Sequence, residues 1–93
     1  MLKDFANRET ERLWKGRRSK AVPPHLREKA VAKLLSIDIA TDVRELEVPP
    51  GNRLHKLGGD REDQWSISIN KQYRICFGFE GGDAYKVEIT DYH

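Results

Sequence analysis

The sequence predicts an α+β fold in which two N-terminal helices pack on a mainly antiparallel, twisted sheet. Two observations support this expectation. Apolar residues recur every three or four positions before the Pro-Pro-Gly-Asn break at residues 49–52, and every second position after it. Helices followed by a meander of strands are typical of the α+β class. A chain of 93 residues has room for one hydrophobic core, so we expect a single domain over residues 1–93.

The N-terminal half is expected to hold two helices. Residues 2–5 alternate apolar and polar side chains, which is compatible with a short strand. Asn7 is a good N-cap, and the helix that it begins should run to Lys15 and end at Gly16. The prolines at 23–24 favour the first turn of a second helix, which should end near residues 40–41. Its expected apolar face consists of Leu26, Ala30, Val31, Leu34 and Leu35.

The C-terminal half is expected to form the sheet. Residues 53–57 are compatible with a short strand before a Gly-Gly-Asp turn, and residues 65–69, 73–79 and 85–89 alternate apolar and polar side chains. Glu-Gly-Gly-Asp at 80–83 is a tight hairpin turn. The alternation predicts that each of the last three strands buries one face and exposes the other.

The charge distribution of the chain favours certain binding partners, and its hydropathy argues against a membrane protein. The net charge is +2, but residues 1–35 hold ten Lys or Arg against four Asp or Glu. A basic first third favours a polyanion or an acidic protein as partner, with a solvent-exposed helix face as the plain alternative. No apolar run approaches the roughly 20 residues of a membrane span, and the N-terminus lacks the apolar core of a signal peptide. We therefore expect a cytoplasmic protein that does not enter membranes.

Cysteine and histidine content argues against a metal or cofactor site. Cys76 has no second cysteine with which to form an internal disulfide, as is usual for proteins of the cytosol. The three histidines, His25, His55 and His93, are scattered and lack ligand spacing such as CxxC or HxxxH. We expect neither a metal nor a cofactor.

The residues that can carry chemistry gather at one end of the expected sheet. Asp91, Tyr92 and His93 follow the last strand, and Arg74 lies in the polar phase of its strand. With His55 they suit phosphodiester transfer in RNA, because histidine can transfer protons and arginine can stabilise charge on phosphate oxygens. Each of these residues taken singly is more often an ordinary surface residue. The residues alone therefore support no more than a small soluble α+β domain that binds RNA.

Five blocks of the second half stand together as a set. They are LHKLGGDR at 54–61, WSISI at 65–69, YRICF at 73–77, GDAY at 82–85 and the terminal DYH at 91–93. The set resembles the HigB toxins of the RelE-like superfamily. This resemblance implies a RelE-like fold and a type II toxin, a metal-independent endoribonuclease that cuts mRNA in the ribosomal A site. It also implies an active site that consists of His55, Arg74, Asp91, Tyr92 and His93.

The resemblance further implies partners, and the basic residues of the chain offer a surface for RNA, for the antitoxin or for solvent alone. The partners would be a HigA-like helix-turn-helix antitoxin, the 70S ribosome with its A-site mRNA, and operator DNA reached only through the antitoxin. A lysine that is frequent in the family two residues before the Asp-Arg pair is Gly58 here, and Lys56 is the nearest cation that could replace it. The expected RNA-binding residues are Lys56, Arg61, Arg17, Arg18 and Lys20, with Arg27 and Lys33 as further phosphate contacts.

The sequence leaves several alternatives open. The domain could bind RNA or a partner protein without cleaving anything, or it could cut RNA without a ribosome. A DNA-binding regulator is disfavoured, because the Pro-rich connector between the helices is unlike the short turn of a helix-turn-helix. The division of acid and base roles between His55 and His93 is also open.

Overall fold

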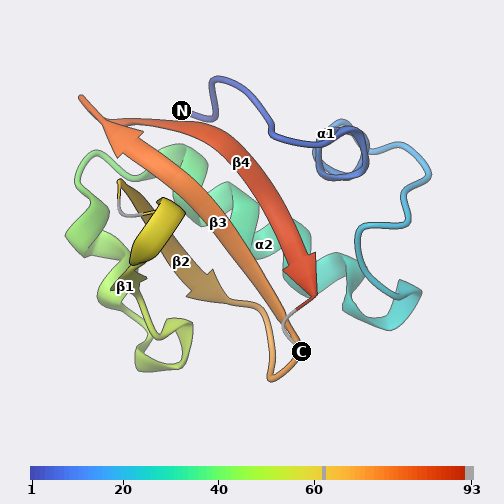
Figure 1. Cartoon of the computed structure of the whole chain (residues 1–93). Coiled ribbons are helices and arrows are strands. Elements are labelled where there is room, and N and C mark those ends of the chain that lie inside the picture. The colour runs from blue at the N-terminus through green and yellow to red at the C-terminus, as the bar shows by residue number, and fades with distance from the viewer. Residues whose placement is uncertain (62, 92–93) are drawn as a thin grey trace.

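The sheet is a four-stranded antiparallel meander. The computed structural model describes residues 1–61 and 63–91 of the chain. Its strands follow one another across the sheet in chain order (Figure 1): β1 (His55–Lys56), β2 (Gln64–Ser68), β3 (Tyr73–Glu80) and β4 (Asp83–Asp91). The expected meander is confirmed, and β4 continues two residues beyond the alternation that predicted it. Residues 2–5 contribute only two parallel bridges to the outer edge of β4, Leu2 to Ala84 and Phe5 to Val87.

The first helix begins and ends as its sequence predicts. In α1 (Arg8–Trp14), the N-cap Asn7 accepts the backbone N–H of Thr10 through its side-chain oxygen at 2.9 Å. The helix stops before Gly16, whose φ of 75° lies in the left-handed region that favours glycine.

The second helix begins three residues later than expected. The prolines at 23–24 lead into a 3-10 turn (Pro24–Leu26), and α2 (Arg27–Ile39) follows it. The turn can use the fixed φ of proline, because the residues at its start need no backbone N–H donor. In the described part of the chain, no helix has the length and apolar character needed to cross a membrane.

The buried face of α2 differs from the expected one at Leu35. Ala30, Leu34 and Ile37 are fully buried, whereas 49% of Leu35 is exposed. Spacings of four and three residues keep the first three side chains on one stripe of the helix. Leu35 lies one residue, or about 100°, further round and so faces solvent. The predicted burial of Leu35 was therefore wrong, and Ile37 takes that place in the core.

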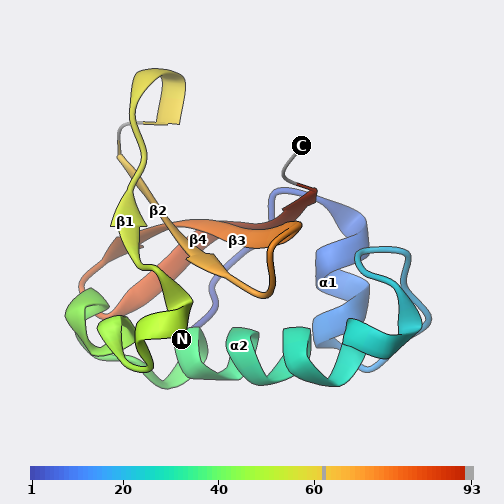
Figure 2. The ribbon, with the colours of Figure 1, turned by 90° about the horizontal axis from the view of Figure 1, so that it is seen from below.

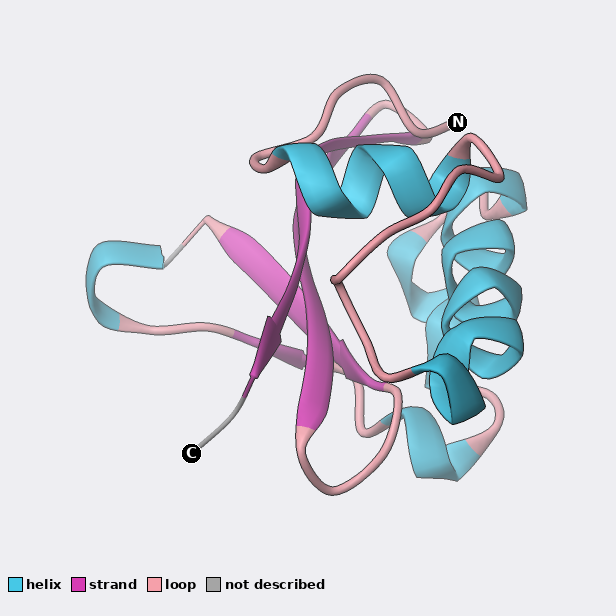
Figure 3. Ribbon diagram, turned by 90° about the vertical axis from the view of Figure 1, so that its right-hand side faces the viewer, coloured by secondary structure: helices cyan, strands magenta, loops and turns pink. Residues whose placement is uncertain are grey.

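Both helices cover the same face of the sheet. Figures 2 and 3 show α1 and α2 on one side of the strands, which confirms the α+β arrangement of helices on a sheet. Phe77 lies in the middle of β3 with no exposed surface, and it belongs to a core to which both helices and three strands contribute. The fully or almost fully buried members of this core include Leu13, Leu34, Ile37, Ile67, Ile75, Phe77 and Val87.

The other face of the sheet is partly covered by the connection between β1 and β2. This connection, called the arm below (residues 57–61 and 63 of the described chain), rises from the sheet on the side away from the helices (Figures 2 and 3). Ser66 and Cys76 belong to the polar phase that was expected to face solvent, yet both are buried. An ion pair of 2.7 Å between Arg61 of the arm and Glu88 of β4 spans this face. The prediction of a fully exposed second face was therefore wrong at these two positions.

Candidate active site

Two rows of polar side chains cross the face of the sheet that is opposite the helices. Directly paired residues of antiparallel strands point to the same face. Ser68, Arg74 and Thr90 are paired in one row, and Arg74 Nη2 donates to Ser68 Oγ at 3.2 Å. Because Ile75 is in the buried core, Arg74 lies on the face away from it, as its place in the polar phase predicts.

The adjacent row begins with His55. His55 pairs with Ser66 of β2, which in turn pairs with Cys76 of β3 and through it with Glu88 of β4. His55 and Arg74 thus stand on strands two spacings apart, roughly 10 Å across the sheet, and one row apart along it. Long side chains on one face can both contact a phosphodiester group at this separation.

The imidazole of His55 is oriented by a backbone carbonyl. Its Nδ1 lies 3.0 Å from the carbonyl oxygen of Arg53. A carbonyl oxygen can only accept, so Nδ1 must carry the proton and donate it. In the neutral ring, Nε2 is then the unprotonated nitrogen, which can accept a proton from a substrate. His55 is exposed, so this nitrogen is open to a ligand.

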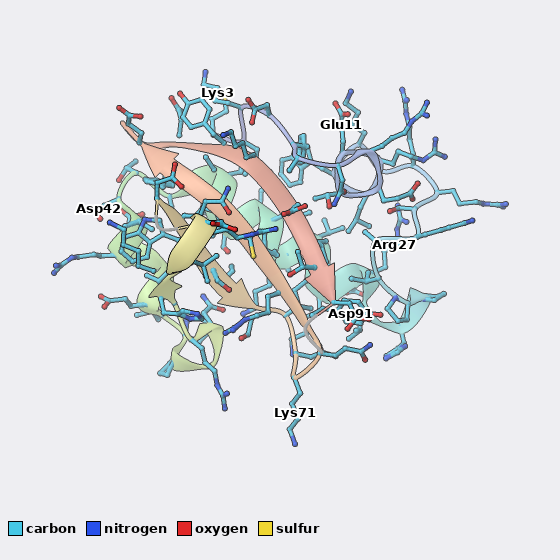
Figure 4. The ribbon with its side chains drawn as sticks, in the orientation of Figure 1. Lys3, Glu11, Arg27, Asp42, Lys71 and Asp91 are labelled. Carbon is cyan, nitrogen blue, oxygen red and sulfur yellow. The ribbon has the colours of Figure 1, made fainter. Side chains whose placement is uncertain are left out.

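Asp91 closes the described part of β4 at the same end of the sheet. It pairs with Tyr73, and its Oδ2 accepts a hydrogen bond of 3.1 Å from Gln72 Nε2. Because Arg74 pairs with Thr90, one residue before Asp91, strand alternation places Asp91 on the face opposite to Arg74. Figure 4 shows Asp91 at the end of β4, near the turn that carries Lys71. Tyr92 and His93, also expected in the site, lie outside the described residues.

Lys56 and Arg61 contact side chains of the protein itself. Lys56 pairs with Trp65, and its Nζ lies 5.8 Å from the centre of the Trp65 ring. Successive strand residues point to opposite faces, so Lys56 is not brought onto the face that His55 occupies. Arg61 is held by its hydrogen-bonded ion pair with Glu88, which raises the pKa of the guanidinium above its ordinary value.

Three basic residues that were expected to bind RNA, Arg17, Arg18 and Lys20, do not converge on Arg74. Arg17, Arg18 and Lys20 are exposed in the loop that follows α1, beyond the outer edge of β4 (Figure 1). Two arginine side chains hold the backbone of this loop: Arg12 Nε donates to the carbonyl of Arg18 at 2.8 Å, and Arg27 Nη2 donates to that of Arg17 at 2.7 Å. The loop is therefore a separate basic surface.

Lys33, which was expected to contact phosphate, is instead part of the framework. Its Nζ donates to the side-chain oxygen of Asn52, which is buried. Burial lowers the pKa of the Lys33 ammonium, and the nearby charge of Lys29 lowers it further. The contact ties α2 to the loop that leads into β1.

A pocket of about 320 Å³ opens beside Arg74, and sequence reasoning did not anticipate it. Three of its four cationic residues, Lys29, Arg53 and Lys71, were not singled out, because they come from separate segments and belong to no motif. The sequence feature nearest to this pocket is the turn-forming stretch Pro-Pro-Gly-Asn at 49–52. In the structure, Arg53 directly after it has a left-handed backbone, with a φ of 49°. Among residues 1–61 and 63–91, no group of three His, Cys, Asp or Glu side chains could hold a metal ion. The lining consists of Lys29, Gly51, Arg53, Ser68, Ile69, Asn70, Lys71 and Arg74.

Comparison with known proteins agrees with this arrangement. A family described as the RelE-like toxin of the type II toxin–antitoxin system HigB matches residues 3–93. Endoribonuclease HigB of Proteus vulgaris is 37% identical over 93 residues, which cover 100% of both chains. Toxin HigB-1 of Vibrio cholerae serotype O1 is 32% identical over 85 residues, 90% of each chain. The match extends over both helices and all four strands, and the chain therefore belongs to the HigB-like family of RelE-like type II toxins.

Proposed function

We propose that this toxin is an endoribonuclease that cuts mRNA in the A site of the 70S ribosome, without a metal, by attack of a ribose 2′-hydroxyl on the adjacent phosphate. Membership of the toxin family and the likeness to a full-length relative named Endoribonuclease HigB support the activity. The observation that carries the proposal is the end of the sheet where Arg74, oriented on Ser68, lies beside the strand that leads through Asp91 into Tyr92 and His93.

The proposed reaction has two proton transfers and one displacement. A base removes the 2′-hydroxyl proton, the oxygen bonds to phosphorus, and the bond to the 5′-oxygen breaks as an acid protonates that oxygen. We assign these transfers to His55 and His93, and the proton-accepting Nε2 of His55 supports a role as base. Arg74 would stabilise the charge on the phosphate oxygens, Asp91 would orient an imidazole, and Tyr92 would stack on a base.

The wider setting of the proposal concerns partners. A type II system includes a protein antitoxin, and we propose that the antitoxin here is a HigA-like helix-turn-helix protein. The toxin would reach operator DNA only as part of its complex with this antitoxin. The exposed Arg17, Arg18 and Lys20 would contact ribosomal RNA by phosphate interactions. Lys56, beside the ring of Trp65, and Arg61, paired with Glu88, would add further contacts to RNA. The toxin would act in the cytoplasm as one domain of residues 1–93.

Primer extension on a defined mRNA tests this function, with purified toxin and with or without programmed ribosomes. We expect cuts in the A-site codon that require ribosomes. His55→Gln and His93→Gln should each slow cleavage about 10²–10⁴-fold, the usual contribution of a general acid or base. His25→Gln is the matched control, because this exposed histidine lies in the 3-10 turn before α2 and should leave cleavage unchanged.

Two outcomes would replace the proposal. Equal cutting of mRNA in the absence of ribosomes would identify a ribosome-independent ribonuclease. Ribosome binding without any cut, in the wild type as in the variants, would identify a binding module that is not an enzyme.

A further inference from the structure

Every charged residue that lines the pocket beside Arg74 is a cation. Lys29 comes from α2, Arg53 from the loop before β1, Lys71 from the turn between β2 and β3, and Arg74 from β3. The lining contains no Asp or Glu. By contrast, another pocket, at the opposite end of the hairpin formed by β3 and β4, mixes Asp63 and Glu80 with Lys86. The first pocket is therefore suited to an anion in a way that the second is not.

The uncharged polar groups of the pocket are also placed to donate. Ser68 Oγ accepts from Arg74, so its own hydroxyl hydrogen can point to a ligand. The side-chain oxygen of Asn70 accepts the backbone N–H groups of Gln72 at 2.9 Å and Tyr73 at 2.7 Å, which leaves its NH₂ group as the part that can face the pocket. A phosphate group only accepts hydrogen bonds, so donors and cations together match its chemistry.

The loop that forms one wall is held in place before any ligand arrives. Asn52, with 1% of its surface exposed, donates to the carbonyls of Leu46 and Val48 and accepts from Lys33. Next to it, the backbone N–H of Arg53 donates to the carbonyl of Pro50 at 3.0 Å. A preorganised wall lowers the entropic cost of binding.

We propose that this pocket binds a backbone phosphate of the mRNA strand next to the phosphate that is cut. The proposal rests on the endoribonuclease function above. Arg74 belongs both to the polar row of the candidate active site and to the lining of the pocket, so one strand can pass from one to the other. An extended single strand presents successive phosphates along such a path.

A binding experiment tests the pocket without requiring cleavage. The probe is a short RNA oligonucleotide with 2′-O-methyl groups throughout, which lacks the attacking hydroxyl. In ¹⁵N-labelled wild-type toxin, we expect the amide signals of Gly51, Arg53, Asn70 and Lys71 to shift on titration. Inorganic phosphate should shift the same signals at higher concentration, and a Glu-rich peptide should not shift them.

Two matched pairs of variants give the affinity test. A Cβ atom at Gly51 would meet nothing within 4 Å, so Gly51→Asp adds a carboxylate to the lining and Gly51→Ala is its control. Lys71→Gln removes a charge at the pocket, and Lys3→Gln removes one at the opposite end of the molecule (Figure 4). We expect Gly51→Asp to raise the Kd about fivefold. Lys71→Gln should raise it about threefold and reduce the slope of log K against log salt by about 0.7.

The outcomes separate this proposal from the function on which it rests. If the wild type cuts A-site mRNA while Gly51→Asp and Lys71→Gln bind like their controls, the phosphate site is refuted and the nuclease function stands. If the pocket variants lose RNA binding but the wild type never cuts, the nuclease function is refuted and a phosphate-binding pocket remains. Tighter binding of the Glu-rich peptide than of RNA would overturn the choice of ligand.

Discussion

Thr10 joins α1 to the outer edge of β4 through a buried hydrogen bond. Its Oγ1 accepts the backbone N–H of Ile89 at 3.0 Å, and Thr10 has no exposed surface. Figure 1 shows α1 beside this part of β4. Ile89 precedes Asp91 by two residues, so the bond fixes the end of the strand that leads into the proposed active site.

The change Thr10→Val retains the branched shape and removes the acceptor. The N–H of Ile89 would then lie buried without a partner, because no other strand among residues 1–61 and 63–91 pairs with β4 at this position. A buried donor left without a partner costs about 1–3 kcal/mol. For a domain of this size, each kcal/mol shifts the Tm by about 4–8 °C, so a fall of roughly 5–20 °C is expected.

Thermal unfolding followed by circular dichroism measures the loss, and hydrogen exchange at the Ile89 amide locates it. Thr10→Ser is the control, because it keeps the hydroxyl and loses one methyl group, worth about 1 kcal/mol. The amide should stay protected in Thr10→Ser and exchange faster in Thr10→Val than global unfolding explains. A Thr10→Val variant with the wild-type Tm and an equally protected Ile89 amide would refute the reasoning.

Two further changes test the loops on either side of the sheet. The backbone N–H of Lys20 donates to Glu9 Oε1 at 2.6 Å and lowers the pKa of that carboxyl below its ordinary value of 4.5. The ionised Glu9 carboxylate therefore stabilises the fold above about pH 4.5, and this stabilisation is lost as the pH falls through the lowered pKa of the folded state. Glu9→Gln should make the Tm fall less steeply at acid pH than in the wild type. An unchanged dependence of the Tm on acid pH would contradict this. Asn52→Ala removes the two hydrogen bonds that the Asn52 side chain donates to the carbonyls of Leu46 and Val48, and the acceptor for Lys33. We expect the free energy of unfolding, measured in urea, to fall by about 2–4 kcal/mol. A fall below about 1 kcal/mol would show that water replaces these bonds.

The fold could be predicted because its local signals agree with one another. The N-cap at Asn7, the left-handed Gly16 and the hairpin at 80–83 each act within a few residues, and the structure uses them as expected. Period-two alternation indicated the three long strands for the same reason, since the core face of a strand is decided by its neighbours in sequence. These features depend little on the rest of the chain.

The predicted exposure of Ser66 and Cys76 was wrong because a distant part of the chain covers them. Ser66 and Cys76 alternate like solvent-facing residues, and their burial depends on the arm that Arg61 holds against Glu88. No pattern within β2 or β3 carries that information. Leu35 failed for a different reason, because adjacent apolar residues on a helix cannot both face a narrow sheet-side stripe.

The candidate site was predictable only in part. Alternation alone placed Arg74 on the face away from the core. The tautomer of His55 depends on the carbonyl of Arg53, a residue with a left-handed backbone, and the cationic pocket depends on segments that are brought together by folding. A list of basic residues in the sequence gives Lys33 and Lys71 equal weight, although the first is tied to Asn52 and the second lines the pocket.

The proposed functional end of the sheet is held from both sides for an electrostatic reason. Four cations, Lys29, Arg53, Lys71 and Arg74, converge on one pocket, and like charges repel one another. A rigid framework must therefore oppose this repulsion in the free protein, and the tie from α2 to Asn52 supplies this on the β1 side of the sheet. The bond from α1 to Ile89 supports the other side. Because a bound phosphate would offset the repulsion, the charges that cost stability in the free toxin would strengthen its hold on a polyanion.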